Sequence, residues 1–471
     1  MDSDAINART PQLAVRSRNK QRSANRVTIS PHMGRALALA IIACIASCYQ
    51  SPSLASCKYR CGGANNDSCP NGYQCNAGMC VAPGEGCDGD GGVIDAPPDD
   101  GDLTDGTIDM IEPPVCTNPN APFWNRQTAT LTTGSNLMQI VAFDGDHDGF
   151  MDIAVLDSSN AIGFYAGNGN GTFSARLSSN AGANAKQLIA GDFDHDGVRN
   201  DLVVLQTGST NAMGVMISNE DGTFTRTDVP IGMNAVDIAN AGDVDGNMFE
   251  DVGILYGGSS ARIEILEQLA TIWQGGAMVA TNMMATSLMM GRVNSGTIPD
   301  AVVTMTGTNQ FGMHAGGGNT YTLGAITAWN VNQGPVDVAA AQMRASGMPS
   351  VVTANQNANN VSLRHATGVN NFSDGGNFAM GTSPKSVILA NVGGSPLPDI
   401  LTANSGSNNF SVLLNQDPTP SATWDASKAI PTDANPIDLV SADFDGDGRL
   451  DVAVACQGAM TVVIYLNKCD P

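Results

Sequence analysis

The chain has few of the side chains on which catalysis and nucleic-acid binding depend. Only 22 of its 471 residues are Lys or Arg, five are His, and 14% are charged. Sequence-independent binding to nucleic acid relies on clustered basic side chains, so a formal net charge of −23 excludes that class of function. No H-E-x-x-H, G-x-S-x-G or G-x-x-x-x-G-K-[ST] motif occurs either, so we predict that the protein is not an enzyme.

The composition also lacks the excess of Glu, Lys and Leu that a coiled coil needs. Hydrophobic residues nevertheless make up 42% of the chain, and 53 residues are Gly. That hydrophobic fraction suffices for a sizeable core, which excludes a disordered acidic chain. Many small polar residues combined with few charges favour an all-β protein with tight turns.

The N-terminal apolar run is too short to span a bilayer. Seven basic residues precede position 36, and an uncharged run of twelve residues, 36–47, follows them. This order predicts a secretory signal peptide over residues 1–47. The run ends in residues 45–48, Ile-Ala-Ser-Cys, which resemble the bacterial lipobox. The resemblance implies lipidation of Cys48, and hence an exported protein held at the bacterial outer membrane or cell surface by a lipid anchor only. Cleavage near Ala46 without lipidation is the alternative.

A short cysteine-rich stretch follows the signal and supports export. Residues 48–87 hold an even number of cysteines besides Cys48, among many Gly, Asn and Pro residues, which predicts a small disulfide-linked knob of open connectivity. These cysteines are Cys57, Cys61, Cys69, Cys75, Cys80 and Cys87. Zinc fits less well, because no His is nearby and no C-x-x-C pair occurs. Residues 88–115 then carry nine acidic and no basic side chains, which predicts an extended linker.

From residue 116 onward the chain is periodic. Three segments share one pattern: DGDHDGFMDIAV from Asp144, DFDHDGVRNDLVV from Asp192 and DFDGDGRLDVAV from Asp443. A fourth, DVDGNMFEDVGI from Asp243, keeps most of it, and decayed copies begin at positions 292, 342 and 391. Seven units with steps of 48 to 52 residues indicate a repeat protein.

A second periodic signal has the same spacing. One aromatic residue falls at a corresponding place in each unit: Trp124, Phe173, Phe224, Trp273, Tyr321, Phe372 and Trp424. Such regular recurrence predicts a core residue that wedges one unit against another.

Each unit contains four short strands with period-2 alternation, which is typical of a propeller blade. The pattern resembles the FG-GAP, or VCBS-type, repeat of integrin α-subunit heads and of many bacterial surface proteins. The expected fold is therefore an all-β, seven-bladed β-propeller over residues 116–471. The last unit lacks its fourth strand, and PFWNRQTATL before the first unit predicts a strand that completes the last blade. This closure would place Cys116 beside Cys469 for a disulfide, and it leaves Cys456 as a buried free thiol.

The acidic loops predict metal sites. In D-x-D-x-D-G-x-x-D the side chains at positions 1, 3, 5 and 9 are expected to converge, the Gly at position 6 permits the turn, and the carbonyl at position 7 adds an oxygen. Oxygen ligands in a flexible loop favour Ca²⁺, and the resemblance implies three to four structural calcium ions. Acidic turns without a metal are the alternative reading. The third unit, from Asp243, has Met248 in place of the Gly, so we expect weaker binding there.

The predicted ligands fall into four groups. The first is Asp144, Asp146, Asp148, the Phe150 carbonyl and Asp152; the second is Asp192, Asp194, Asp196 and Asp201. The third is Asp243, Asp245, Asn247 and Asp251; the last is Asp443, Asp445, Asp447, the Arg449 carbonyl and Asp451.

The sequence thus predicts a lipid-anchored, calcium-binding propeller that acts as a binding or adhesion module. Its expected partner is a glycan or an envelope or extracellular protein, and not nucleic acid. Two alternatives stay open. One is a propeller enzyme that acts on polysaccharide through Asp residues on the face opposite the metal loops. The other is a scaffold in an envelope complex.

Overall fold

The computed structural model describes residues 74–76, 79–81, 123–127 and 130–468, apart from gaps at 209–210, 271, 297, 319–320, 394, 417–423 and 425. The chain divides into two compact units, Met1–Gly91 and Gly92–Pro471. In the first unit, β1 (Gln74–Asn76) and β2 (Met79–Val81) form an antiparallel hairpin in which Cys75 lies opposite Cys80. The predicted signal peptide, the rest of the predicted knob and the acidic linker lie outside the described residues. Among the described residues, no helix is long and apolar enough to cross a membrane.

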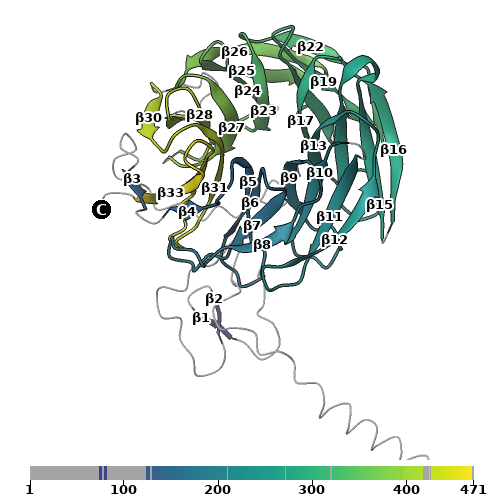
Figure 1. The fold of residues 1–471 in the computed structure, drawn as a ribbon. Coiled ribbons are helices and arrows are strands. Elements are labelled where there is room, and N and C mark those ends of the chain that lie inside the picture. The colour runs from purple at the N-terminus through teal and green to yellow at the C-terminus, as the bar shows by residue number, and fades with distance from the viewer. Residues whose placement is uncertain are drawn as a thin grey trace, which may run out of the picture. The chain divides into compact units, whose positions relative to one another are not determined.

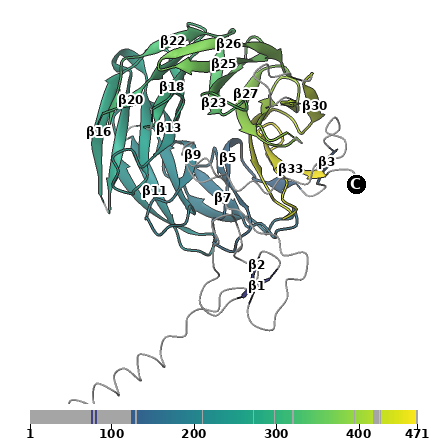
Figure 2. The same cartoon turned by 180° about the vertical axis from the view of Figure 1, so that it is seen from behind.

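The second unit is a ring of seven antiparallel sheets, the blades of a β-propeller, which confirms the predicted fold (Figure 1). In blades 1 to 6 the strands pair in chain order from the centre outward, and in blade 7 β3 takes the outermost place after β31, β32 and β33. The first strands of neighbouring blades contact one another (Figure 2). Because successive strands alternate in direction, the loops between first and second strands all lie on one face of the ring.

The first three blades are regular. Blade 1 contains β5 (Leu137–Phe143), β6 (Asp152–Asp157), β7 (Ala161–Tyr165) and β8 (Leu177–Asn180). Blade 2 contains β9 (Ala185–Gly191), β10 (Asp201–Gln206), β11 (Ala212–Ser218) and β12 (Phe224–Pro230). Blade 3 contains β13 (Ala235–Gly242), β14 (Asp251–Tyr256), β15 (Arg262–Leu269) and β16 (Ile272–Ala280), with a short 3-10 turn η1 (Gly258–Ser260).

The other blades follow the same plan. Blade 4 contains β17 (Ala285–Gly291), β18 (Asp300–Met305), β19 (Gln310–His314) and β22 (Thr327–Asn330), with a side hairpin of β20 (Gly316–Gly317) and β21 (Thr322–Leu323). Blade 5 contains β23 (Pro335–Ala341), β24 (Ser350–Asn355), β25 (Asn360–Gly368) and β26 (Asn371–Ala379). Blade 6 contains β27 (Pro384–Ala390), β28 (Asp399–Asn404), β29 (Asn409–Leu413) and β30 (Lys428–Pro431). Blade 7 contains β31 (Pro436–Ala442), β32 (Asp451–Cys456), β33 (Thr461–Lys468), β3 (Phe123–Arg126) and β4 (Leu131–Thr132).

The hydrophobic core lies between the blades. All residues of each second strand are buried, as in β6, because both faces of that strand pack against a neighbouring blade. These strands have mostly apolar interiors that begin at a buried Asp or Ser, whereas the outermost strands, such as β26, alternate between exposed and half-buried positions. One apolar cluster fills each of the seven interfaces between adjacent blades.

The recurring aromatic residues pack into these clusters, as predicted. Each one contacts or joins the core shared with the preceding blade. Phe173 meets Phe444 at 5.6 Å between ring centroids, and Trp273 meets Phe193 at 6.3 Å. Tyr321 is 3% exposed in the core between blades 3 and 4.

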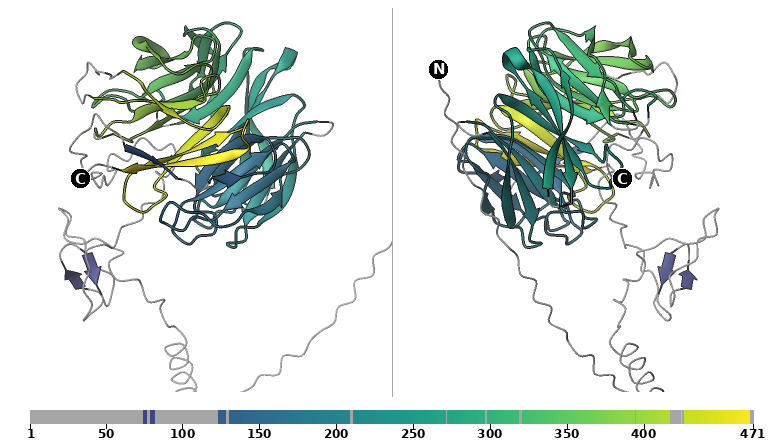
Figure 3. Two further views of the ribbon diagram at one scale, coloured as in Figure 1. Left: turned by 60° about the vertical axis from the view of Figure 1, so that its left-hand side comes forward. Right: turned by 90° about the vertical axis from the view of Figure 1, so that its right-hand side faces the viewer.

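The ring closes as the sequence predicts. β3 pairs antiparallel with β33, so that Phe123 lies opposite Lys468 and Arg126 opposite Tyr465 (Figure 3). The Arg126 guanidinium also donates a hydrogen bond of 2.6 Å to Asp433. Cys456 is a buried free thiol, as expected, and burial raises its pKa to about 11. Cys116 and Cys469 lie outside the described residues, so their disulfide stays a prediction.

An inner belt of side chains joins the first strands around the centre. It has one member per blade at the same position: Gln139, Gln187, Asp237, Ser287, Asp337, Ser386 and Asp438. Five of them accept a backbone amide hydrogen bond from the next blade, for example Asp237 Oδ2 from Leu288 N at 2.6 Å and Asp438 Oδ2 from Ile140 N at 3.2 Å. Burial raises the pKa of Asp237 and Asp438 to about 7 and also raises that of Asp337.

We predict that Trp124→Ala destabilises the ring by about 3 kcal/mol, because this half-buried side chain fixes the closing strand against Phe410, with ring centroids 5.5 Å apart. Chemical denaturation monitored by circular dichroism measures the loss. Asn125→Ala, an exposed position in the same strand, is the matched control and should change stability little. Equal denaturation midpoints for the two variants would show that the packing of Trp124 does not hold the closing strand.

Candidate metal centre

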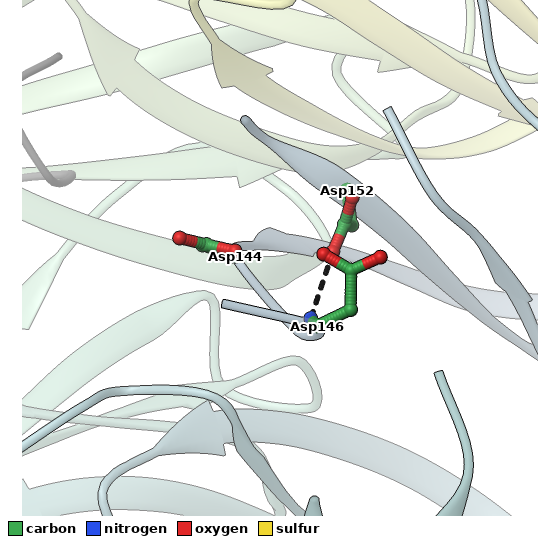
Figure 4. Close-up of side chains that lie close together, drawn as sticks. All are labelled: Asp144, Asp146 and Asp152. Carbon is green, nitrogen blue, oxygen red and sulfur yellow. Dashed lines mark hydrogen bonds between the residues drawn. The ribbon is translucent and has the colours of Figure 1, made fainter. Parts of the chain in front are cut away.

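In blade 1 three carboxylates gather in the loop between β5 and β6. Asp144, Asp146 and Asp152 each offer an oxygen, and these oxygens lie within 4.8 Å of one another (Figure 4). Asp152 begins β6 and is fully buried. Its Oδ2 accepts the backbone amides of Gly145 at 2.7 Å and of Asp146 at 3.2 Å, so the loop is wound around this side chain.

Three further blades repeat the arrangement. The corresponding triads are Asp192, Asp194 and Asp201 in blade 2, Asp243, Asp245 and Asp251 in blade 3, and Asp443, Asp445 and Asp451 in blade 7. These are the four loops that the sequence singles out. In each one the side chains at positions 1 and 3 meet the last aspartate, which is at position 9 in blades 1, 3 and 7 and at position 10 in blade 2, where the sequence has one extra residue before Asp201. Because blade 7 adjoins blade 1, the four triads occupy consecutive blades.

The side chains at position 5 are engaged differently. Asp148 Oδ1 accepts the backbone amide of Phe150 at 2.9 Å, and Asp196, Asn247 and Asp447 each bond the amide two residues later in the same way. None of the four belongs to a triad. The structure therefore brings three of the expected side chains together, while position 5 bonds the turn, and ligation through position 5 stays a prediction. The carbonyl ligands at Phe150 and Arg449 stay predictions.

The loops turn through left-handed residues at positions 4 and 6. Gly149 and Gly448 have φ of 90° and 79° at position 6, where a Gly is expected. Met248 adopts φ of 74° at the same place in blade 3, so the turn survives the substitution with strain on the order of 1–2 kcal/mol. His147 and His195 take φ of 58° and 62° at position 4.

The electrostatics of the triads fit a hard cation. Asp146 Oδ1 and Asp445 Oδ1 are buried without a hydrogen-bond partner, which is costly for a carboxylate. Burial, together with the neighbouring carboxylates, raises the pKa of Asp152 to about 7 and that of Asp451 to about 8. A divalent cation with oxygen ligands would satisfy the unpaired oxygens and offset the repulsion.

Blade 7 differs from the other three because basic side chains contact its acidic loop. Lys468 Nζ, at the end of β33, contacts Asp445 and lies 3.0 Å from Asp447, and Arg449 contacts Asp447 as well. A metal ion in this triad would compete with the Lys468 ammonium, which contacts Asp445 Oδ2 and leaves Oδ1 unpaired. The sequence did not indicate this, because Lys468 follows the loop by a whole hairpin.

The aspartate that begins the second strand also occurs in blades 4 and 6, whose described residues hold no acidic triad. Asp300 in blade 4 accepts the amides of Val293 and Asn294, and Asp399 in blade 6 accepts those of Val392 and Gly393. In blade 5 the position is Ser350, whose hydroxyl bonds His365 Nδ1 at 2.8 Å. This residue therefore holds the loop in six blades, whether or not the loop carries further carboxylates.

Fold and site together define a seven-bladed β-propeller with acidic loops on one face. Two of its stretches, residues 144–199 and 394–454, match the FG-GAP-like repeat. The seven-bladed propeller thus contains FG-GAP-like repeats, as the resemblance implied.

Among solved structures, BBS1N in complex with ARL6DN, soaked with lead, aligns with a TM-score of 0.52 at 11% identity over 74% of this chain and 98% of that chain. The same complex soaked with mercury gives a TM-score of 0.51 at 9% identity over 74% and 97%. At such identities the likeness is one of fold alone. No curated protein matches the chain in sequence.

The raised pKa values predict an effect of pH on stability that depends on the metal. Asp152, Asp201 and Asp251 have native pKa values of about 7, above their ordinary value near 3.8. Between these limits the native state holds protons that the unfolded chain has released, so stability in a chelator falls as pH rises from about 4 to about 7. Bound calcium keeps the carboxylates ionised in the native state and should flatten this fall.

Urea denaturation across this pH range, with calcium and with chelator, measures the difference. Asp237 and Asp438 titrate both with calcium and with chelator, so they affect both curves of stability against pH. Only the difference between the two curves therefore reports metal binding at the acidic loops. Parallel curves would contradict a metal at the triads.

Proposed function

We propose that the protein is an exported, lipid-anchored, calcium-binding β-propeller that acts as a non-catalytic binding or adhesion module at the bacterial cell envelope. The observation that carries the proposal is the set of four acidic triads on one face of the ring, two of which hold buried carboxylate oxygens without partners. Calcium at these loops would stiffen consecutive blades 7, 1, 2 and 3 and leave blades 4 to 6 to their apolar cores.

A binding role agrees with the hydrogen bonds that the carboxylates at the centre of the ring make. The inner-belt carboxylates nearest the centre, Asp237, Asp337 and Asp438, each accept backbone amides from a neighbouring blade. They are thus engaged in holding the ring rather than paired across a cleft, as a polysaccharide-cleaving enzyme would need.

An open pocket of about 690 Å³ lies beside η1. It is lined by residues 258–262 and 278–283, with Arg262 as its charged side chain and no Asp or Glu. Its lining comes from turns between second and third strands and between blades, so it lies on the face opposite the triads. The partner class we propose is a glycan or an envelope or extracellular protein. BBS1N, which shares the fold, is in complex with another protein, ARL6DN.

A binding screen of the purified chain against glycans and envelope proteins, with and without calcium, tests the proposed role. Binding without turnover supports it. Release of shortened glycan products would instead establish the enzyme alternative, and assembly with several envelope proteins in the absence of any glycan ligand would favour the scaffold.

Calcium should act on the four loops locally. At about 1 mM calcium, a site with Kd of about 10⁻⁴–10⁻³ M stabilises the native state by roughly 0.4–1.4 kcal/mol. We expect hydrogen exchange with chelator to show lost protection at residues 144–152, 192–201 and 243–251, a smaller loss at 443–451 beside Lys468, and little change in blades 4 to 6.

The variant Asp146→Asn sharpens this test. It replaces a carboxylate whose Oδ1 has no hydrogen-bond partner, so the chelated protein should keep its stability or gain some. The calcium-dependent protection of residues 144–152 should disappear. Uniform loss of protection around the ring would contradict local action, and no calcium effect at any loop would reject the calcium sites.

Lipid anchoring is tested at Cys48. Cys48→Ser should move the protein from the membrane fraction to the soluble fraction of cells, because the residue that would carry the lipid is gone. Cys456→Ser, at a buried free thiol in β32, is the matched control and should stay with the membrane. Recovery of the Cys48→Ser variant in the membrane fraction would refute the lipid anchor.

A further inference from the structure

The triads of blades 1, 2 and 3 are connected by side chains that the sequence did not single out. In blade 2, Ser218 ends β11, and its amide donates to Asp201 Oδ1 at 2.8 Å. The Ser218 hydroxyl donates to the carbonyl of Gly145 at 2.7 Å, inside the acidic loop of blade 1. Gly145 in turn donates its own amide to Asp152.

Blade 3 repeats this link with a longer side chain. The Gln268 amide donates to Asp251 Oδ1 at 2.8 Å, and its Nε2 donates to the Phe193 carbonyl at 2.6 Å. Phe193 lies between two triad members of blade 2, and its amide donates to Asp201 Oδ2 at 2.9 Å. Gln268 is 2% exposed, so the link is shielded from water.

A continuous path of hydrogen bonds therefore runs from one triad to the next. From Asp152 it passes through the Gly145 peptide and Ser218 to Asp201, and then through the Phe193 peptide and Gln268 to Asp251. Both ends of each link touch backbone that a bound cation would fix, because Gly145 and Phe193 each lie between two ligands of their own loop.

We propose that Ser218 and Gln268 are positioning residues that couple calcium binding at blades 1, 2 and 3, so that occupancy of one triad raises the affinity of the next. A cation at Asp144 and Asp146 orders the Gly145 carbonyl. The ordered carbonyl holds the Ser218 hydroxyl, and the Ser218 amide holds Asp201 in the geometry that the second cation needs. The coupling rests on the proposed calcium sites, and it is reciprocal by thermodynamic linkage.

The ring supplies a matched control. In blades 5 and 6 Asn415 makes the same two bonds, from its amide to Asp399 at 2.7 Å and from Nδ2 to the Met343 carbonyl at 3.0 Å. Neither of these blades has an acidic triad among its described residues. Asn415→Ala thus removes an equivalent link where there are no calcium sites to couple.

The experiment is a calcium titration of the full chain followed by hydrogen exchange, which gives a midpoint for each loop. Disabling blade 1 with Asp146→Asn should raise the calcium midpoint of residues 192–201 at least about fivefold. In a Ser218→Ala background the same change should move that midpoint less than twofold. Ser218→Thr, which keeps the hydroxyl, should restore the shift, a rescue that mere loss of stability would not produce.

The outcomes separate the two proposals. If calcium protects all the acidic loops but their calcium midpoints do not depend on one another, the coupling is overturned and the calcium sites remain. If calcium protects none of the loops, both the coupling and the calcium sites are rejected. If Asn415→Ala abolishes the shift as Ser218→Ala does, the effect is general destabilisation and the coupling is overturned. Should Ser218→Ala fail to fold, Gln268→Met tests the link between blades 2 and 3 by the same two midpoints.

Discussion

The buried aspartate that begins the second strand is the side chain on which the propeller most depends. In blade 2, Asp201 accepts amides from its own loop, at Phe193 and Asp194, and from Ser218 at the end of the third strand. One carboxylate thus satisfies three backbone donors that no strand pairing could reach. Because it fixes the second residue of the loop, it also sets Phe193 between blades, where it packs against Trp273.

That arrangement buries a charge, and the blades offset the cost in different ways. In blades 4 and 6 the described residues hold the aspartate but no triad, and three backbone amides donate to Asp399. Blades 1, 2 and 3 add two more carboxylates, which repel one another and leave Asp146 Oδ1 without a partner. Blade 7 adds them as well but brings Lys468 against Asp445. The acidic triads are therefore additions to a loop that folds without them, which is why metal binding need not be shared by all blades.

The sequence predicts those features that recur with a recognisable residue type. The repeat, the wedging aromatics such as Phe173 and the closing strand at Trp124 all follow from spacing, because each blade must fill the same gap. The sequence does not reveal the inner belt, because its members Gln187, Asp237 and Ser287 share a position but not a residue type. Any hydrogen-bond acceptor that reaches the first strand of the next blade can serve at that position. The contact of Lys468 with Asp445 and the link through Ser218 depend on side chains brought together by neighbouring hairpins or blades, which spacing alone does not reveal.

The position of the triads follows from the way the ring is closed. Most blades are covalently continuous, but the body of blade 7 is joined to its outer strands through the pairing of β33 with β3 and β4. A second tie runs through the acidic loop of blade 7, where the Phe444 carbonyl accepts the amide of Gly171 in blade 1 at 2.8 Å and its ring packs on Phe173. Opening the ring requires these ties to break, together with the apolar cluster between blades 7 and 1 and the hydrogen bond from Ile140 to Asp438. A cation that fixed residues 443–451 would strengthen the tie made through Phe444 and would therefore oppose opening at this junction.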